Sequence, residues 1–366
     1  MILTLSPTPL ANRTANGRVR LLGRVSQLIW FQCVFLSLTC GLRAFAQNDQ
    51  ADDPIPTLRW KFQAGQVYQF DITQTSGTEE IDVAGNKTLQ PESRHVQIQW
   101  TIVAATEELI DVEMYYREIE IELGTKSGKV AVSTRPDAPQ IGAGKVSSLL
   151  KGLLQRLKPL IDQPIKVQVD RQGKVRRVEL PAELVAHIQQ KPETRSLRDA
   201  VSTKGIEQLL ASFLTPLPSD PVATWEHRST YEVAAGVPLT QRTRFQLGPW
   251  SEANPTVEVT YSSELSFPEQ FLLGAREPND PAASPAKDPN PPTGAAPPFD
   301  FDPVSQKWPR IDQQDCDGRL LFDINEGYVR EASGRTVLVT EKAYSDTKIK
   351  ITTSMQTEVK VQRLQP

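Results

Sequence analysis

The residues that could perform chemistry are few and scattered along this chain. Its three histidines are His95, His187 and His227, and no cysteine lies near any of them in sequence. Metal sites place such ligands at short, regular spacings, which this chain lacks. His95 also has the opposite parity to the apolar residues around it, which predicts a place on the polar face of a strand. We therefore expect three surface or boundary histidines and no metal site.

Motifs for nucleophiles and nucleotides are equally weak. The sequence has no G-x-S-x-G stretch. Ser148 and Lys151 match the S-x-x-K of penicillin-recognising enzymes, but the partner motifs are missing or in the wrong order. Gly142 to Lys145 contains two glycines and a lysine without the P-loop spacing. We expect no catalytic residue and no cofactor.

Two groups of acidic residues have simpler explanations than catalysis. Asp312, Asp315, Asp317 and Gly318 resemble a calcium loop, but its first ligand and its bidentate acid are absent, so we expect an acidic turn before a strand. A second group alternates along one strand, which predicts a solvent-facing side. A hydrolase that uses paired acids of this strand stays an alternative. This second group consists of Glu113, Glu118, Glu120 and Glu122.

The first 47 residues have the layout of a secretory signal peptide. Four arginines precede an uncharged apolar run, Leu28 to Leu42, and Ala44-Phe45-Ala46 follows. We expect cleavage between Ala46 and Gln47, because a run of 15 residues is shorter than the ~20 that span a bilayer. The sequence thus predicts an exported protein, periplasmic or extracellular, with no stable transmembrane anchor after cleavage.

Two other readings of this N-terminus stay open. The apolar run could remain uncleaved as a membrane anchor. It could also belong to a lipoprotein signal ending at Cys40, although the leucine of that motif stands one place too late.

Cleavage would change both the charge and the cysteine content. It removes five of 41 basic residues and no acid, so 36 basic and 44 acidic residues remain, a net charge near −8. Such an acidic balance argues against nucleic acid as a partner. Cys33 and Cys40 would leave with the signal, so Cys316 could form no intramolecular disulfide. Its two flanking aspartates disfavour a reactive thiolate, and we expect no role for it.

Apolar residues at every second position dominate the chain from residue 57 to 134. Ile110, Val112 and Met114 occupy even positions, whereas Ile119 and Ile121 occupy odd ones. A switch of parity within one long run predicts a β-bulge near residues 116 to 118. This part is therefore predicted to be an antiparallel meander of long strands.

The middle of the chain has helical spacing instead. We predict a helix at residues 147–158 from its leucines, a short strand pair at 165–169 and 175–180, a helix after Pro181 and another from about Ser196. Further strands are predicted at 222–233, 239–247 and 256–267.

A Pro-rich stretch then interrupts every pattern. Ten of the 34 residues from 276 to 309 are proline, a composition that buries too little apolar surface to order itself. We interpret residues 276–310 as a disordered insertion, and a domain boundary there is the alternative. Strand patterns resume at 320–324, 328–329 and beyond, 336–340 and 348–361.

The predicted fold class is α+β. It combines a large, curved, half-barrel-like antiparallel sheet with a mid-sequence helical block packed on one face. The predicted organisation is a signal peptide (1–46), one domain (57–275 plus 311–364) and the insertion (276–310).

Several short stretches resemble an uncharacterised family of exported bacterial β-rich proteins. Its usual Gly-Asp pair before the tryptophan is replaced here by Ala223-Thr224. This resemblance implies structural marks and no catalytic residue. More loosely, the pattern is similar to half-barrel carriers of lipoproteins or lipids in the bacterial envelope. The stretches are Trp60-x-Phe62-x-x-Gly65-x-x-Tyr68, Asp170-x-x-Gly173-x-Val175, Phe213-Leu214-x-Pro216-Leu217-Pro218, and Val222 with Trp225.

The sequence favours a non-catalytic envelope protein that binds an apolar ligand or lipid, at ligand-binding residues it does not identify. A structural or protein-interaction module that uses the Pro-rich segment to bind an envelope protein is the alternative.

Overall fold

The computed structural model describes residues 54 to 364, apart from 82–86, 126–127, 139–140, 142–144, 191–202, 211–213, 215, 234–236, 252, 267–309 and 345–346. The predicted signal peptide, its cleavage site at Ala46 and Gln47, and the Pro-rich insertion except Arg310 lie outside the described residues.

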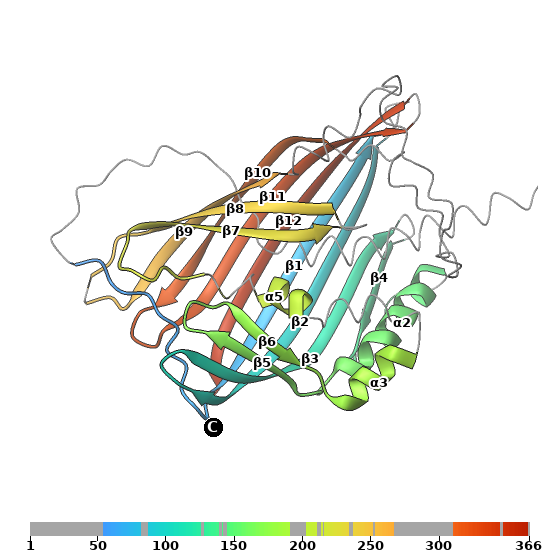
Figure 1. The fold of residues 1–366 in the computed structure, drawn as a ribbon. Coiled ribbons are helices and arrows are strands. Elements are labelled where there is room, and N and C mark those ends of the chain that lie inside the picture. The colour runs from blue at the N-terminus through green and yellow to red at the C-terminus, as the bar shows by residue number, and fades with distance from the viewer. Residues whose placement is uncertain are drawn as a thin grey trace, which may run out of the picture.

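The described chain forms one 12-stranded sheet (Figure 1). The strands are β1 (Val67–Ile81), β2 (Lys87–Ala105), β3 (Leu109–Thr125), β4 (Gly128–Ser133), β5 (Ile165–Asp170), β6 (Val175–Glu179), β7 (Thr224–Val233), β8 (Val237–Leu247), β9 (Thr256–Ser266), β10 (Arg310–Asp323), β11 (Tyr328–Tyr344) and β12 (Thr347–Leu364).

The first and last strands lie side by side in the centre of the sheet. The order is β6-β5-β3-β2-β1-β12-β11-β10-β9-β8-β7, with β4 paired to β3, and neighbouring strands are antiparallel. β9 and β10, which flank the Pro-rich segment in sequence, are paired directly from Thr256–Asp323 to Ser262–Asp317. The sheet is open, with β6 and β7 at its edges.

The predicted bulge in β3 is confirmed. Ile98 of β2 pairs with Tyr116 and Gln97 pairs with Glu118, so Arg117 is the extra residue. Because one residue is added, the buried positions move from Tyr116 to Ile119 and the core face is restored.

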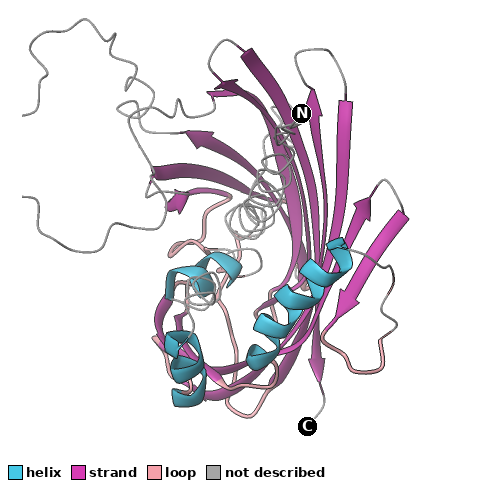
Figure 2. Cartoon of the chain, turned by 90° about the vertical axis from the view of Figure 1, so that its right-hand side faces the viewer, coloured by secondary structure: helices cyan, strands magenta, loops and turns pink. Residues whose placement is uncertain are grey.

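The sheet bends strongly, so that one face is concave (Figure 2). Its two edges approach each other at the end where the C-terminus lies. There the amide of Leu217, which precedes β7, donates to the carbonyl of Gln172 in the β5–β6 turn at 3.2 Å. The indole of Trp225 on β7 donates to the Pro216 carbonyl at 2.8 Å.

The helices are short and do not form the predicted block. α2 (Lys145–Leu157) continues into the 3-10 turn η1 (Lys158–Leu160), and then β5 and β6 intervene before α3 (Ala182–Gln190) and α5 (Thr203–Leu210). The β5–β6 pair joins the edge of the main sheet through β3, which separates the helices along the chain. The fold is thus β-rich, with one large open antiparallel sheet and few helices.

Two predictions in the C-terminal part are wrong. The acidic stretch Asp312 to Gly318 is not a turn, because it lies inside β10, which begins at Arg310 and pairs with both β9 and β11. The runs at 328–329 and 336–340 belong to one strand, β11. Small and polar inward residues such as Gly334 and Thr336 hide its alternation from a search for apolar residues.

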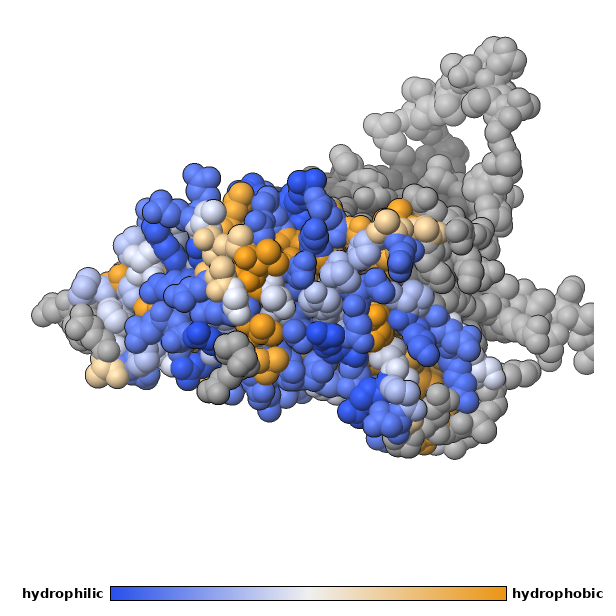
Figure 3. Space-filling model, turned by 90° about the horizontal axis from the view of Figure 1, so that it is seen from below, coloured by the Kyte–Doolittle hydropathy of each residue, from blue (hydrophilic) through white to orange (hydrophobic). Residues whose placement is uncertain are grey.

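Among the described residues, no helix is long and apolar enough to cross a membrane. Seen from below, the surface is mostly hydrophilic with small separate apolar areas (Figure 3). The exposed large apolar side chains belong to different segments, namely Ile55, Leu89, Val103, Ile141 and Val222.

Candidate ligand-binding face

One half of the concave face, called the aromatic half below, is filled by large buried side chains from β1, β2, β10 and the segment before β1. The Trp60 ring packs 5.5 Å from Phe62 and 5.6 Å from Phe322 between centroids. Phe62 lies 4.9 Å from Tyr68, and Phe70 lies 5.0 Å from Trp100. The aromatic half consists of these residues and the core cluster around them, which includes Leu154, Leu184 and Leu210 of the helices.

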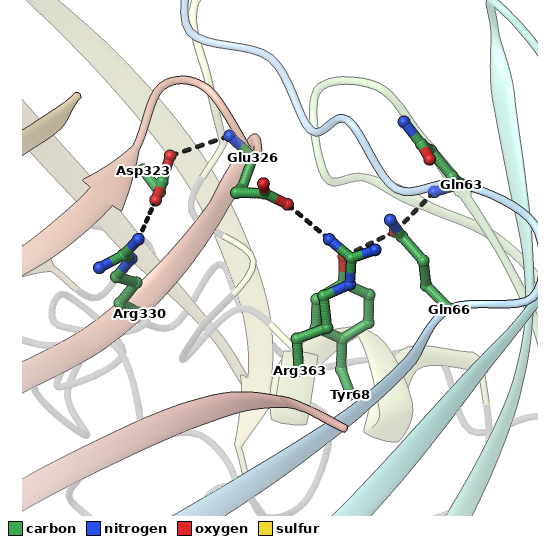
Figure 4. Close-up of polar contacts among 7 residues, drawn as sticks. All are labelled: Gln63, Gln66, Tyr68, Asp323, Glu326, Arg330 and Arg363. Carbon is green, nitrogen blue, oxygen red and sulfur yellow. Dashed lines mark hydrogen bonds and ion pairs between the residues drawn. The ribbon is translucent and has the colours of Figure 1, made fainter. Parts of the chain in front are cut away.

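Polar groups at the rim of the aromatic half are paired (Figure 4). The Gln66 Oε1 accepts hydrogen bonds from the Tyr68 hydroxyl at 2.7 Å and from the backbone N–H of Gln63 at 2.9 Å. Arg363 donates to Glu326 Oε2 at 2.7 Å. Burial raises the pKa of the Tyr68 hydroxyl, and the nearby Arg363 opposes that effect. At neutral pH this hydroxyl is therefore a neutral hydrogen-bond donor.

The carboxylate of Asp323 at the same rim is also satisfied. It is 1% exposed, accepts the Glu326 amide at 2.8 Å and forms an ion pair with Arg330. Both oxygens of this buried carboxylate therefore have a partner. The aromatic half is therefore a tightly packed core with a paired polar rim, although the buried Trp60 Nε1 within it has no hydrogen-bond partner.

A row of aromatic rings and glycines crosses the sheet above this core. Trp225 stacks on Phe245 at 5.1 Å, and Phe245 lies 5.7 Å from Tyr261. Tyr261 pairs in register with Gly318, which faces Gly334 on β11. A Cβ on Gly318 would lie 2.6 Å from Tyr261 Cζ, so the absence of a side chain there lets the ring lie against the strand.

Beyond this row, toward the Ile81 end of β1, the concave face has a different composition. Its side chains are small, polar or aliphatic, and all are buried. Among the described residues, its aliphatic and sulfur-containing members do not belong to the hydrophobic cluster of the aromatic half. We call this region the polar half, and it consists of Gln74, Leu239, Gln241, Thr243, Ser263, Leu265, Cys316, Thr336, Leu338, Met355 and Thr357.

Three side chains of the polar half form a hydrogen-bonded triad across β8 and β9. The Gln241 Nε2 donates to Thr243 Oγ1 at 3.1 Å and to Ser263 Oγ at 3.2 Å. The two hydroxyls lie 2.7 Å apart. Gln241 is 1% exposed, yet its Oε1 has no hydrogen-bond partner. A buried acceptor without a donor costs roughly 1–3 kcal/mol. Among the described residues the Trp60 indole nitrogen is likewise buried without a partner, but it is a donor, whereas the Gln241 oxygen is an acceptor.

Side chains also extend the sheet in this half. The β9–β10 pairing ends at Ser262 and Asp317, and beyond it the Gln314 side chain bonds to the β9 backbone. Its Oε1 accepts the Leu265 amide at 2.8 Å, and its Nε2 donates to the Leu265 carbonyl at 3.2 Å. Cys316, which forms no disulfide, is fully buried here, so the residue expected to have no role lies within the polar half.

The outer face brings together three residues that could hold a metal ion. The ligand atoms of His95, Glu118 and Glu120 all lie within 4.8 Å of one another. The bulge at Arg117 creates this cluster, because it places Glu118 and Glu120 on the same face as His95. Glu118 already accepts the Arg135 Nε at 3.0 Å, so a cation would have to displace this guanidinium. We interpret the cluster as an ion-paired network.

The burial of Glu118 corrects one expectation. It was predicted on a solvent-facing side, and it does lie on the outer face, but it is only 6% exposed. β4 is the reason, because Ser133 at its end donates to Glu118 Oε1 at 3.2 Å and Arg135, two residues later, forms an ion pair with the same oxygen. Glu113, in contrast, accepts a hydrogen bond from Tyr115, and together with burial it raises the pKa of that hydroxyl.

The structure leaves the other candidate residues dispersed. His227 is an exposed residue on β7 and pairs with Thr243 in register. Ser148 and Lys151 lie exposed on α2. The side chain of His187 and residues 142–144 lie outside the described part. Nothing in the described residues joins any of these into a catalytic set.

A shallow groove of about 330 Å³ lies on the sheet across β10, β11 and β12. Four of its ten lining residues are charged, and two of these, Glu331 and Lys360, face each other in register. Paired exposed charges of this kind are ordinary surface features. The groove therefore offers no directed set of groups, in contrast to the polar half.

No family model matches this chain, and no curated protein matches it. Among solved structures, DynF from the dynemicin biosynthesis pathway of Micromonospora chersina is 9% identical, with 90% of this chain and 96% of that chain covered and a TM-score of 0.21. An outer membrane channel from Pseudomonas putida F1 is 7% identical over 86% and 100%, also with a TM-score of 0.21. OccK11 (OpdR) of Pseudomonas aeruginosa is 9% identical over 84% and 100%, with a TM-score of 0.17. Scores this low do not indicate a shared fold.

Proposed function

We propose that this chain is an exported, non-catalytic envelope protein that binds a lipid-like ligand on the polar half of its concave face. In this proposal the sheet acts as a half-barrel, and the helices close the end that holds the aromatic half. The proposal agrees with the signal-like N-terminus and with the resemblance to exported β-rich proteins and half-barrel carriers.

The observation that carries the proposal is the mixed chemistry of the polar half. Leu265, Leu338 and Met355 are buried but stand apart from the main core cluster. Beside them lie the Gln241 triad and its unpartnered oxygen. Sites for small molecules combine apolar walls with a few placed polar groups in this way.

The apolar part suits an alkyl chain. Cys316 pairs in register with Thr336, and Thr336 pairs with Met355, so these side chains share the concave face of adjacent strands. Burial of one methylene group contributes about 0.8 kcal/mol, so even a short alkyl chain on this face would bind measurably.

Native mass spectrometry of the protein purified gently from a bacterial periplasm tests the proposal. We expect an extra mass in the lipid range on the wild-type protein. Thr243→Trp fills the polar half and should remove that mass, and Thr336→Phe should do the same from another strand. Thr75→Trp is the matched control, because Thr75 is exposed on the opposite face of β1.

Circular dichroism of each variant shows whether it is folded. A wild-type protein without extra mass that also takes up no added lipid contradicts the proposal. That result would favour the alternative role as an interaction module that uses the Pro-rich segment. Equal loss of the mass in Thr75→Trp would place the ligand elsewhere.

A further inference from the structure

The polar half carries no full charge on its β8 to β11 side. Every Asp, Glu, Lys and Arg in the stretches 239–247, 257–265, 314–320 and 332–338 has the opposite parity to the buried residues. Arg242 and Arg244 of β8 are exposed on the other face, and Asp317 of β10 is exposed there too. An anionic or cationic head group would therefore be buried here without a counter-charge, which is costly.

Charged groups at the edges of this region do not change that conclusion. On β2 the nearly buried Glu92 and Arg94 neutralise each other in an ion pair. On β7, partial desolvation by neighbouring atoms and the nearby Lys174 lower the pKa of the exposed His227, which keeps that imidazole neutral at pH 7.

The unpartnered atom in the polar half is an acceptor. Both hydrogen bonds of the Gln241 side-chain amide use its Nε2 as donor, and its Oε1 accepts none. An amide oxygen pairs only with an N–H or O–H group. A ligand that supplies this hydrogen removes the desolvation cost of the oxygen, whereas a ligand with acceptors only leaves that cost in place.

Aliphatic side chains on β8, β9 and β11 flank the triad, whereas its register partners on β7 are Ser229 and His227. Gln241 pairs in register with Leu265, and Leu239 lies two residues before it on the same face. Gln314, whose side-chain oxygen accepts a hydrogen bond from the Leu265 backbone N–H, pairs in register with Leu338. The donor group must therefore sit at the end of an apolar body.

We propose that the ligand is a neutral lipid bearing a hydroxyl group, such as a long-chain alcohol or a monoacylglycerol, and that its hydroxyl donates to Gln241 Oε1. This inference rests on the proposed function and names the ligand class for the same face. It excludes fatty acids and phospholipids as the preferred ligands, because both bring a charge.

Competition binding with three matched lipids tests this inference. Hexadecan-1-ol, its methyl ether and hexadecanoate share one chain and differ in the head, which is a neutral donor, a neutral acceptor or an anion. Each displaces the neutral fluorescent probe N-phenyl-1-naphthylamine from the protein. We expect the alcohol to bind about tenfold more tightly than the ether and than the acid at pH 8, as one buried hydrogen bond predicts.

Variants of Gln241 locate the effect. Gln241→Leu, and Gln241→Met if the first does not fold, should bind the alcohol and the ether equally. Gln74→Leu is the control, because Gln74 is a buried amide of the same half whose Nε2 contacts Met355 Sδ at 2.9 Å. This control should keep the preference for the alcohol.

The outcomes separate the two proposals. Equal binding of the alcohol and the ether to the wild-type protein, or tighter binding of hexadecanoate, overturns the hydroxyl inference and leaves the lipid-binding function standing. A preference that survives in Gln241→Leu also overturns it. Failure of the probe and all three lipids to bind contradicts the proposed function itself.

Discussion

The two halves of the concave face are built from many of the same strands and yet differ in the chemistry of their buried side chains. In the aromatic half, rings fill the space between the sheet and the helices, and rim groups such as the Tyr68 hydroxyl have partners. In the polar half, small, polar and aliphatic side chains occupy the concave face, and the acceptor Gln241 Oε1 has no partner. The difference indicates that the first half stabilises the fold, whereas the second is suited to contact something else.

The largest expected effect is on the aromatic half. Phe322→Ala should lower the free energy of unfolding by about 3–5 kcal/mol, because a ring packed on Trp60 leaves a cavity when removed. Leu338→Ala in the polar half should cost about 2 kcal/mol, near the low end for such a change. Urea denaturation of both variants measures the contrast, and equal losses would contradict the division into two halves.

The boundary between the halves should be sensitive to a single methyl group. Gly318→Ala would place a Cβ 2.6 Å from both the Ser333 carbonyl oxygen and the Tyr261 ring. We expect a loss of about 1–3 kcal/mol from overpacking. Gly152→Ala on α2 is the control, since nothing lies within 4 Å of its added carbon, and it should stabilise by about 0.5–1 kcal/mol. Thermal unfolding distinguishes the two signs.

Within the triad, two substitutions should differ in cost. Thr243→Val removes a hydroxyl that contacts both Gln241 and Ser263, so we expect a loss of about 1–3 kcal/mol. Gln241→Leu also removes the unpartnered oxygen and leaves the hydroxyl pair intact, so its cost should be smaller. Chemical denaturation without lipid tests this order. A larger cost for Gln241→Leu would mean that its oxygen is satisfied in solution.

The smallest expected effect is on pH dependence. Partial desolvation by neighbouring atoms and the nearby Lys174 lower the pKa of His227 in the folded state, so the unfolded chain binds the proton more readily. This contribution destabilises the protein as pH falls below the histidine pKa of the unfolded chain, which is about 6.5. It levels off once the pH is below the pKa of His227 in the folded protein. Because His227 is exposed, the change should be slight. His227→Gln should flatten the stability profile between pH 7 and 5, and Lys174→Met should flatten it in part.

The sequence was informative where apolar alternation is strong. The parity of Ile110 to Ile121 predicted the bulge at Arg117. The start of β10 was missed because its inward residues, Gln314, Cys316 and Gly318, are not large apolar side chains. Acidic residues on its outer side further resembled a turn.

The candidate site could not be predicted, since its groups meet only through the sheet register. Gln241 and Ser263 are 22 residues apart, and Cys316 follows the Pro-rich stretch. The burial of Glu118 depends on β4, and the His95 cluster depends on the β2–β3 register. A signal that could have pointed to the polar half is the alternation of Leu239, Gln241 and Thr243, which continues the parity of Phe245 with polar residues on the core side.

Photocrosslinking tests the central claim most directly. A hexadecan-1-ol analogue with a diazirine in its chain is bound to the purified protein and irradiated, and the modified peptides are identified by mass spectrometry. The account predicts adducts on concave residues of the polar half, such as Leu265, Leu338 and Met355, and their loss in Thr243→Trp. Adducts confined to the outer face, for example to the groove lined by Glu331 and Lys360, would contradict it.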